Sequence, residues 1–123
     1  MLQSKSYKSS DEWLPMFGSQ ARGKGLVKDG LFAADMLKFN PLEKTTLHTH
    51  PGNHILFVVE GDGWLIFDNA KHDLTTGVCY FVPGATPHQV ISSSTGMILL
   101  SVSDNHRPVS SEERLSVVTT PQN

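Results

Sequence analysis

Four of the six histidines of this chain fall into two short segments, and their type and spacing could do chemistry. The first segment reads His48-Thr49-His50-Pro51-Gly52-Asn53-His54, and the second ends on His88 after Pro83-Gly84-Ala85-Thr86-Pro87. Neutral imidazole is the commonest protein ligand of a transition metal. Two histidines at positions i and i+2 of a strand share a face, about 7 Å apart at the backbone. His48 and His50 can therefore converge on one ion.

The three residues between His50 and His54 read as a tight turn, because proline, glycine and asparagine favour turn geometry. His54 can then begin a returning strand with its ring directed at the same point as His48 and His50. We therefore predict that a metal ion lies at the centre of this protein.

Composition describes an ordinary single domain: 123 residues, 38% of them hydrophobic and 18% charged. The formal net charge is -2 and the pI is about 6.3, and the ten lysines and arginines are scattered along the chain. Such a distribution gives no electrostatic reason to bind nucleic acid. We expect a small-molecule partner.

The single cysteine, Cys79, cannot form an internal disulfide, and the first residues lack the apolar stretch of a signal peptide. The longest continuous apolar run, Ile55 to Val59, is far shorter than a membrane span. We expect a cytoplasmic protein without membrane association.

Short apolar runs recur at the spacing typical of an all-β sandwich or barrel, separated by glycine, proline, asparagine and aspartate. The strands that we expect are Leu31 to Asn40, Thr45 to His50, His54 to Glu60, Gly63 to Phe67, Val78 to Val82, His88 to Ser92 and Gly96 to Ser103. Gly61-Asp62-Gly63 predicts a hairpin turn between two of them. We divide the chain into an N-terminal segment (1–30), a barrel (31–104) and a C-terminal tail (105–123) that frays beyond Pro108.

Alternation along the strands predicts which side chains face the barrel interior. Five apolar residues are expected to line an internal cavity: Leu56, Val58, Ile98, Leu100 and Val102. The strand after His54 is also apolar on its other face, at Ile55, Phe57 and Val59. That outer face must be covered by the N-terminal segment or by a second subunit, and we expect a homodimer.

The two histidine segments resemble the motifs of the cupin family, small β-barrels that hold one divalent metal with three histidines and a glutamate. The first motif, His-x-His, then Glu, then Gly, is matched by His48, His50 and Gly61, with His54 in the glutamate slot. The second motif is matched from Gly77 through Pro83-Gly84 to His88, with Ala85 in place of glycine and Ser92 in place of asparagine. Leu42 stands where the family has a leading glycine. The resemblance covers Leu31 to Asp104 and is specific for fold.

This resemblance implies a cupin double-stranded β-helix, or jelly-roll, barrel with one divalent transition metal ion, Mn, Fe, Ni, Zn or Cu. It implies His48, His50, His54 and His88 as the ligands. Small cupins with four histidines include oxidising enzymes of the dioxygenase type, and near relatives process sugar acids. The resemblance does not choose among these reactions.

Imidazole in the glutamate slot leaves the double charge of the metal uncompensated by its ligands. Such a site should favour an anionic or enolisable oxygen ligand, such as a carboxylate, a hydroxy-ketone or peroxide. A six-coordinate ion would keep two positions open for substrate, whereas tetrahedral zinc would be closed and structural.

We therefore expect a metal-dependent enzyme acting on a small oxygenated organic molecule, with oxidation or dioxygenation slightly preferred. The alternatives are sugar-acid isomerase or lyase chemistry, and a non-catalytic small-molecule-binding cupin with a structural metal. Catalytic residues stay unknown, because no spacing forces Lys38, Glu60, Tyr80 or Asp104 into the cavity. His72 and His106 are expected to be exposed, Cys79 is expected to be a small buried hydrophobe, and glycines 23 and 25 are expected to lie in a loop.

Overall fold

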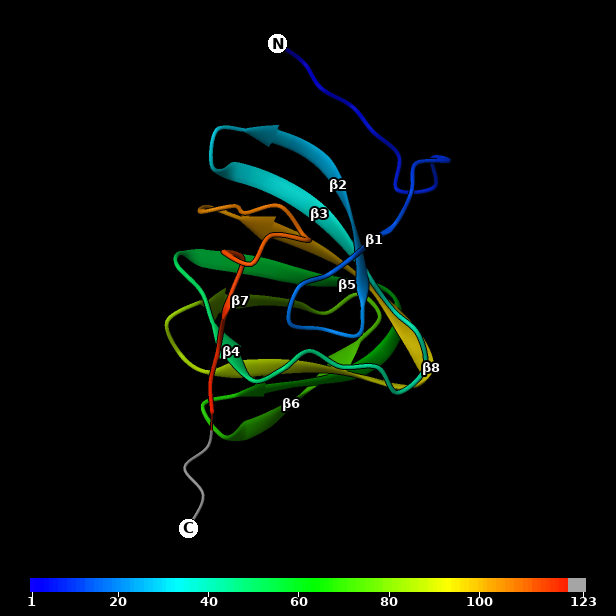
Figure 1. The fold of residues 1–123 in the computed structure, drawn as a ribbon. Coiled ribbons are helices and arrows are strands. Elements are labelled where there is room, and N and C mark those ends of the chain that lie inside the picture. Colours follow the sequence, from blue (N-terminus) through cyan, green and yellow to red (C-terminus); the bar gives the residue numbers. More distant parts are fainter. Residues whose placement is uncertain (120–123) are drawn as a thin grey trace.

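The computed structural model describes residues 1–119, which form one strongly curled antiparallel sheet (Figure 1). This part of the chain contains no helix, so the all-β prediction is confirmed. The strands are β1 (Leu14–Pro15), β2 (Arg22–Asp29), β3 (Phe32–Phe39), β4 (His48–Thr49), β5 (Asn53–Phe67), β6 (Ala70–Thr75), β7 (Cys79–Pro83), β8 (His88–Ser103) and β9 (Ser116–Val117).

Two long strands, β5 and β8, form the spine of the barrel. They pair with each other in two stretches, and the register shifts between Gly61 and Gly63. The expected hairpin at Gly61-Asp62-Gly63 is therefore wrong, because the chain continues through these residues as one bent strand. Gly61 has a φ of 76°, and a Cβ there would collide with the carbonyl of Gly96. Glycine thus permits the close crossing at which the sheet curls.

The remaining strands extend the sheet from this spine. β8 pairs with β3 and β4, β3 continues to β2 and β1, and β4 continues to β9. β5 also pairs with β6 and β7. In the register of β4 and β8, His48 lies opposite His88, which brings the two sequence motifs together.

The interior of the barrel is filled by apolar side chains, but β8 turns the opposite face inward from the one that we expected. Met97, Leu99 and Ser101 are buried, whereas Ile98, Leu100 and Val102 are only half-buried. Both faces of this strand carry apolar residues, so apolarity alone does not orient it. The inward face includes Ser101, whose hydroxyl lies 3.2 Å from Nδ1 of His54.

Both ends of the described chain contribute to the sheet. Gly23 and Gly25 were expected in a loop, but they belong to β2, which pairs with β3. Lys24 is buried there, and its Nζ donates hydrogen bonds to the carbonyls of Tyr7 and Ser9 and lies 4.8 Å from the centre of the Trp13 ring. The N-terminal segment therefore packs on β2, not on the outer face of β5.

The C-terminal segment does not fray beyond Pro108 as expected. Val109 and Leu115 are buried, and β9 pairs with β4. A Cβ added at Gly23 would collide with Val109, and one at Gly18 would collide with Leu115. These two glycines thus make room for the side chains that fasten the segment to the barrel, while residues 120–123 lie outside the described part.

The outer face of β5 and β7 is apolar and open. Ile55, Phe57 and Phe81 are exposed, and Ile55 lies opposite Phe81 in the register of the two strands. Cys79 is exposed as well, which corrects the expectation that it is buried. The described part of the chain contains no helix that is long and apolar enough to span a membrane.

Candidate metal centre

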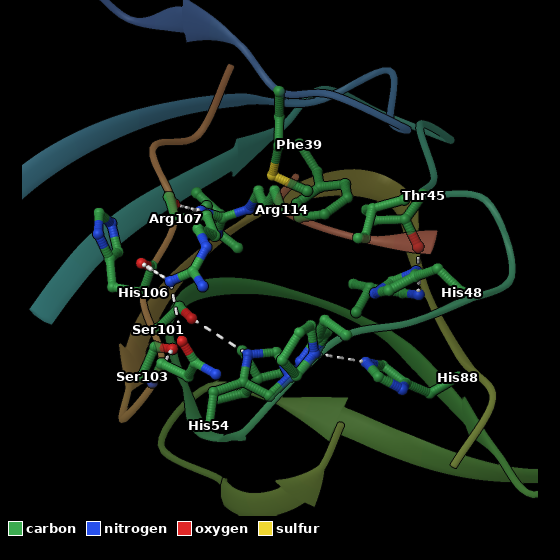
Figure 2. A pocket seen from close by; sticks show the side chains of 18 residues that line it. Phe39, Thr45, His48, His54, His88, Ser101, Ser103, His106, Arg107 and Arg114 are labelled. Atoms are coloured by element: carbon green, nitrogen blue, oxygen red, sulfur yellow. Dashed lines mark hydrogen bonds between the residues drawn. The ribbon is translucent and has the colours of Figure 1, made fainter. Parts of the chain in front are cut away.

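The four motif histidines line one pocket, and Figure 2 labels His48, His54 and His88 in it. His48 lies in β4, His54 near the start of β5, and His88 at the start of β8. His50 follows β4 directly, and its backbone N–H donates to the carbonyl of Gly84 over 2.9 Å. The turn before His88 therefore also holds the backbone of His50.

Local hydrogen bonds set the protonation of two of these rings. Nδ1 of His48 lies 2.7 Å from the carbonyl of Thr46, and Nδ1 of His88 lies 2.7 Å from the carbonyl of Thr86. A carbonyl can only accept, so Nδ1 carries the proton in both rings. Each neutral ring then presents the lone pair of Nε2 to the interior, which is how metal-binding histidines are commonly oriented.

The Nε2 atoms converge at a distance that suits a shared ion. Nε2 of His50 lies 3.1 Å from Nε2 of His88 and 3.3 Å from Nε2 of His54. Metal–nitrogen bonds of about 2.0–2.1 Å place neighbouring ligand nitrogens roughly 2.9–3.4 Å apart. Nε2 of His88 carries no proton, so when the proton of His50 is on Nδ1 two lone pairs face each other across 3.1 Å. A cation between them would remove that repulsion.

Three of the four histidines form a compact cluster. Ligand atoms of His48, His50 and His88 lie within 4.8 Å of one another. His54 does not belong to this set: its Nε2 contacts His50, and its Nδ1 lies 3.2 Å from Oγ of Ser101. The residues present therefore fit a metal ion held by three histidines, with His54 beside them as a candidate fourth ligand.

The environment keeps these imidazoles neutral. Burial lowers the pKa of His48 to about 3 and that of His50 to about 4, with His88 adding repulsion in both cases. Burial also holds the pKa of His54 well below its ordinary value, and lowers the pKa of His88. At neutral pH the rings are therefore uncharged, and each keeps one ring nitrogen free of a proton.

The histidines line a pocket whose enclosed volume is about 50 Å³. Of the five residues expected to line the cavity at the histidines, only Leu56 lines this pocket. Val58 is fully buried in the core, and Ile98, Leu100 and Val102 lie on the outer face of β8. Phe39, Met16 and Leu37 supply apolar surface instead.

A second wall of the pocket was not predicted. It consists of His106, Arg107 and Arg114, from the C-terminal segment, and Figure 2 shows it across the pocket from His48 and His88. His106 was expected to be exposed, but its Nε2 donates to the buried carboxylate of Asp35, 3.0 Å from Oδ2. No sequence motif predicts this wall, because the residues that bond to each other in it are far apart: Asp35 and His106 are separated by 71 residues.

Comparisons with known proteins agree with this architecture. Residues 35–103 match the family Cupin_2, described as a cupin domain, and the chain belongs to this family. An uncharacterized protein of Methanocaldococcus jannaschii, MJ1618, is 35% identical over 48 residues. The matched stretch covers 38% of this chain and 38% of that relative, so the chain spans well under two thirds of its length.

Several solved structures share the fold. The polyketide cyclase RemF from Streptomyces resistomycificus has a TM-score of 0.73 and 17% identity, covering 92% of this chain and 90% of its own. KdgF from Halomonas sp. has a TM-score of 0.71 and 20% identity, covering 79% and 88%. A salicylate 1,2-dioxygenase variant from Pseudoaminobacter salicylatoxidans, in complex with gentisate, has a TM-score of 0.63 and 19% identity, covering 68% and 25%. At these identities the likeness concerns the fold alone.

Proposed function

We propose that this cupin is a metal-dependent enzyme acting on a small oxygenated organic molecule, with oxidation or dioxygenation as the preferred reaction class. The observation that carries the proposal is the convergence of ligand nitrogens of His48, His50 and His88 within 4.8 Å in one pocket, with Nε2 of His54 3.3 Å from Nε2 of His50. Buried lone pairs that face each other need a cation, and the adjoining pocket offers space for a second molecule beside it.

His48, His50, His54 and His88 together would hold one divalent ion, Mn, Fe, Ni, Zn or Cu. Bound there, the metal would supply Lewis-acid polarisation of substrate oxygen atoms, or redox chemistry if it is iron, manganese or copper. The carbonyls of Thr46 and Thr86 orient two of the ligand rings, and the Ser101 hydroxyl contacts a third. Leu37, Phe39 and Leu56 limit the water around the site.

A non-catalytic binding role is the main competing function, and the modest pocket volume favours it. About 50 Å³ accommodates only a few water-sized groups. In this role the metal would brace the barrel or anchor a small carboxylate without turning it over. Sugar-acid isomerase or lyase chemistry is a further candidate, but no carboxylate lines the pocket in the described residues to act as general base.

Coordination number separates the enzyme from the structural metalloprotein. The protein is purified without added metal, the ion is identified by elemental analysis, and its ligand sphere is measured by X-ray absorption spectroscopy. The proposal expects a six-coordinate ion with two exchangeable oxygen ligands, and oxygen consumption when small hydroxy- or oxo-carboxylates are added. A closed four-coordinate zinc that exchanges no water would refute the enzymatic role.

We also propose that the protein is a homodimer that buries the outer face of β5 and β7. The exposed side chains of Ile55, Phe57 and Phe81 support this, because a contiguous apolar surface of a sheet is commonly covered by a partner. Sedimentation analysis of the parent and of Phe81→Glu tests it. We expect a dimer that becomes monomeric in the variant, and a monomeric parent would contradict the proposal.

A further inference from the structure

Arg114 lines the pocket from a C-terminal segment that packs against the barrel before and after this residue. Val109 and Leu115 are buried against Gly23 and Gly18, and the backbone N–H of Arg114 donates to the carbonyl of Ser111 over 3.1 Å. Its side chain is only 15% exposed. The position of the guanidinium is therefore restricted by the surrounding protein.

One nitrogen of this guanidinium makes all of its hydrogen bonds to the described protein. Nη1 donates to Oδ2 of Asp35 over 3.2 Å and to the carbonyl of Arg107 over 3.0 Å. Within residues 1–119, Nε and Nη2 have no protein acceptor, and no buried polar side-chain atom lacks a partner. These two nitrogens are thus accessible donors, although the side chain as a whole is largely covered. A guanidinium edge of this kind matches the geometry of a carboxylate.

The positive charge of the pocket around Arg114 comes from its arginines, because the four motif histidines are neutral. Its lining contains two arginines and five histidines, and neither aspartate nor glutamate. Asp35 is buried behind the wall, where His106 and Arg114 already bond to it. A divalent ion at the histidines would add two further charges. An anion is the ligand that such a pocket favours.

We propose that Arg114 binds the carboxylate of a small anionic ligand whose other oxygen reaches the metal, so that the pocket selects short carboxylates with a second oxygen donor. This inference rests on the proposed metal centre. The small pocket volume of about 50 Å³ favours a short ligand. Asp35 is the positioning residue, since it holds Nη1 and leaves the other edge of the guanidinium free.

Arg107 lines the same wall but is less suited to this role. Its Nη1 donates to Oδ1 of Asn105 and to the carbonyl of His106, and its Nε lies 3.8 Å from Oε2 of Glu113. Two of its three nitrogens therefore already face protein oxygens. In addition, Glu113 neutralises its charge in part.

The test uses malonate, which has two carboxylates on one carbon, and malonamate, in which an amide replaces one of them. Both are titrated calorimetrically into Mn²⁺-loaded and metal-free protein. In Arg114→Gln we expect malonate affinity to fall at least about tenfold, because a charge-assisted bidentate contact is lost. Malonamate keeps one carboxylate for Arg114 and offers its amide oxygen to the metal, so its affinity should fall by a similar factor. Arg22→Gln removes the same charge from an exposed site outside the pocket and should change neither.

Arg114→Lys provides a second variant if Arg114→Gln does not fold, because lysine keeps the charge beside Asp35 but loses the planar fork. Malonate should then bind several-fold more weakly than to the parent. Unchanged malonate affinity in a folded Arg114 variant that still holds Mn²⁺ would overturn the arginine proposal and leave the metal centre intact.

The opposite failure has its own signature. If the parent binds no Mn²⁺, or any other divalent ion of the series, the proposed metal function fails. The role of Arg114 would then stand only if the metal-free parent binds malonate more tightly than Arg114→Gln does. Equal binding there would overturn both proposals.

Discussion

The two walls of the pocket are built in different ways. The histidine wall is organised locally: the carbonyls that orient His48 and His88 each lie two residues earlier in the chain. The arginine wall is organised at long range, since Asp35 holds His106 and Arg114 across 71 and 79 residues. The histidine wall suits a cation and the arginine wall suits an anion. The two walls share no hydrogen bond within the described residues, so substitutions can alter one without altering the other.

The largest effect should follow from removing the histidine at the centre of the first wall. Mutating a residue that hydrogen-bonds to a metal ligand commonly lowers metal affinity by about 10–100-fold. His50→Ala deletes a ligand itself, so it should lower metal affinity by at least about a hundredfold. The metal-to-protein ratio of the purified variant measures this. His72→Ala is the control, because His72 lies outside the pocket. Full metal occupancy in His50→Ala would remove this residue from the site.

Gly84→Ala should disturb the same wall without touching a ligand. A Cβ at Gly84 would collide with the ring of His50 and with the carbonyl of Gly52. We expect metal affinity to fall about tenfold or more as His50 is displaced. Gly25→Ala is the matched control, since its Cβ would meet only Oδ1 of Asp35 at an ordinary 3.7 Å. Equal metal affinity in the two variants would contradict this account of Gly84.

Acid should weaken the histidine wall of the metal-free protein. His48 and His50 have folded pKa values of about 3 and about 4, below the ordinary value of 6.5, so the unfolded chain binds more protons between these limits. Stability should therefore be greatest above about pH 6.5 and fall as the pH drops toward 4 and then 3. Thermal unfolding at a series of pH values measures it. A melting temperature that is constant from pH 7 to pH 4 would count against this assignment.

His54→Glu should change the charge of the histidine wall while keeping its metal. Glutamate occupies this slot in the cupins that the motif resembles, and it would lower the charge of the loaded site by about one unit. Malonate should bind several-fold more weakly, with metal content and fold unchanged. His72→Glu is the control and should alter neither quantity. Loss of the metal in His54→Glu would show that this position does not accept a carboxylate ligand.

The smallest effect should come from Asp35→Asn, which loosens the arginine wall alone. The amide can still accept one hydrogen bond, so Arg114 should lose part of its orientation rather than its charge. We expect malonate affinity to fall a few-fold while the metal content stays constant. Asp29→Asn, at an exposed position of β2, is the control. A drop in metal content in Asp35→Asn would mean that the two walls are coupled.

Sequence reasoning worked where short-range patterns carry the information. The spacing of His48, His50 and His88 placed them on adjoining β-segments, and three of the four motif histidines form a cluster in the structure. It failed at Gly61-Asp62-Gly63, where glycines typical of a hairpin instead let one strand bend past Gly96. The same residue types serve both geometries, and only the pairing partner distinguishes them.

The sequence by itself determined an all-β domain with clustered histidines, because strand periodicity and i, i+2 spacing act within a few residues, and its two histidine motifs resemble those of cupins. Only the tertiary structure decided that β8 turns Ser101 rather than Leu100 inward, and that Arg114 and His106 face the histidines. Those outcomes depend on contacts between residues far apart in the chain, such as Val109 against Gly23 and Arg114 on Asp35. Neither residue of such a pair predicts the other from the local sequence, because the two meet only in the folded barrel.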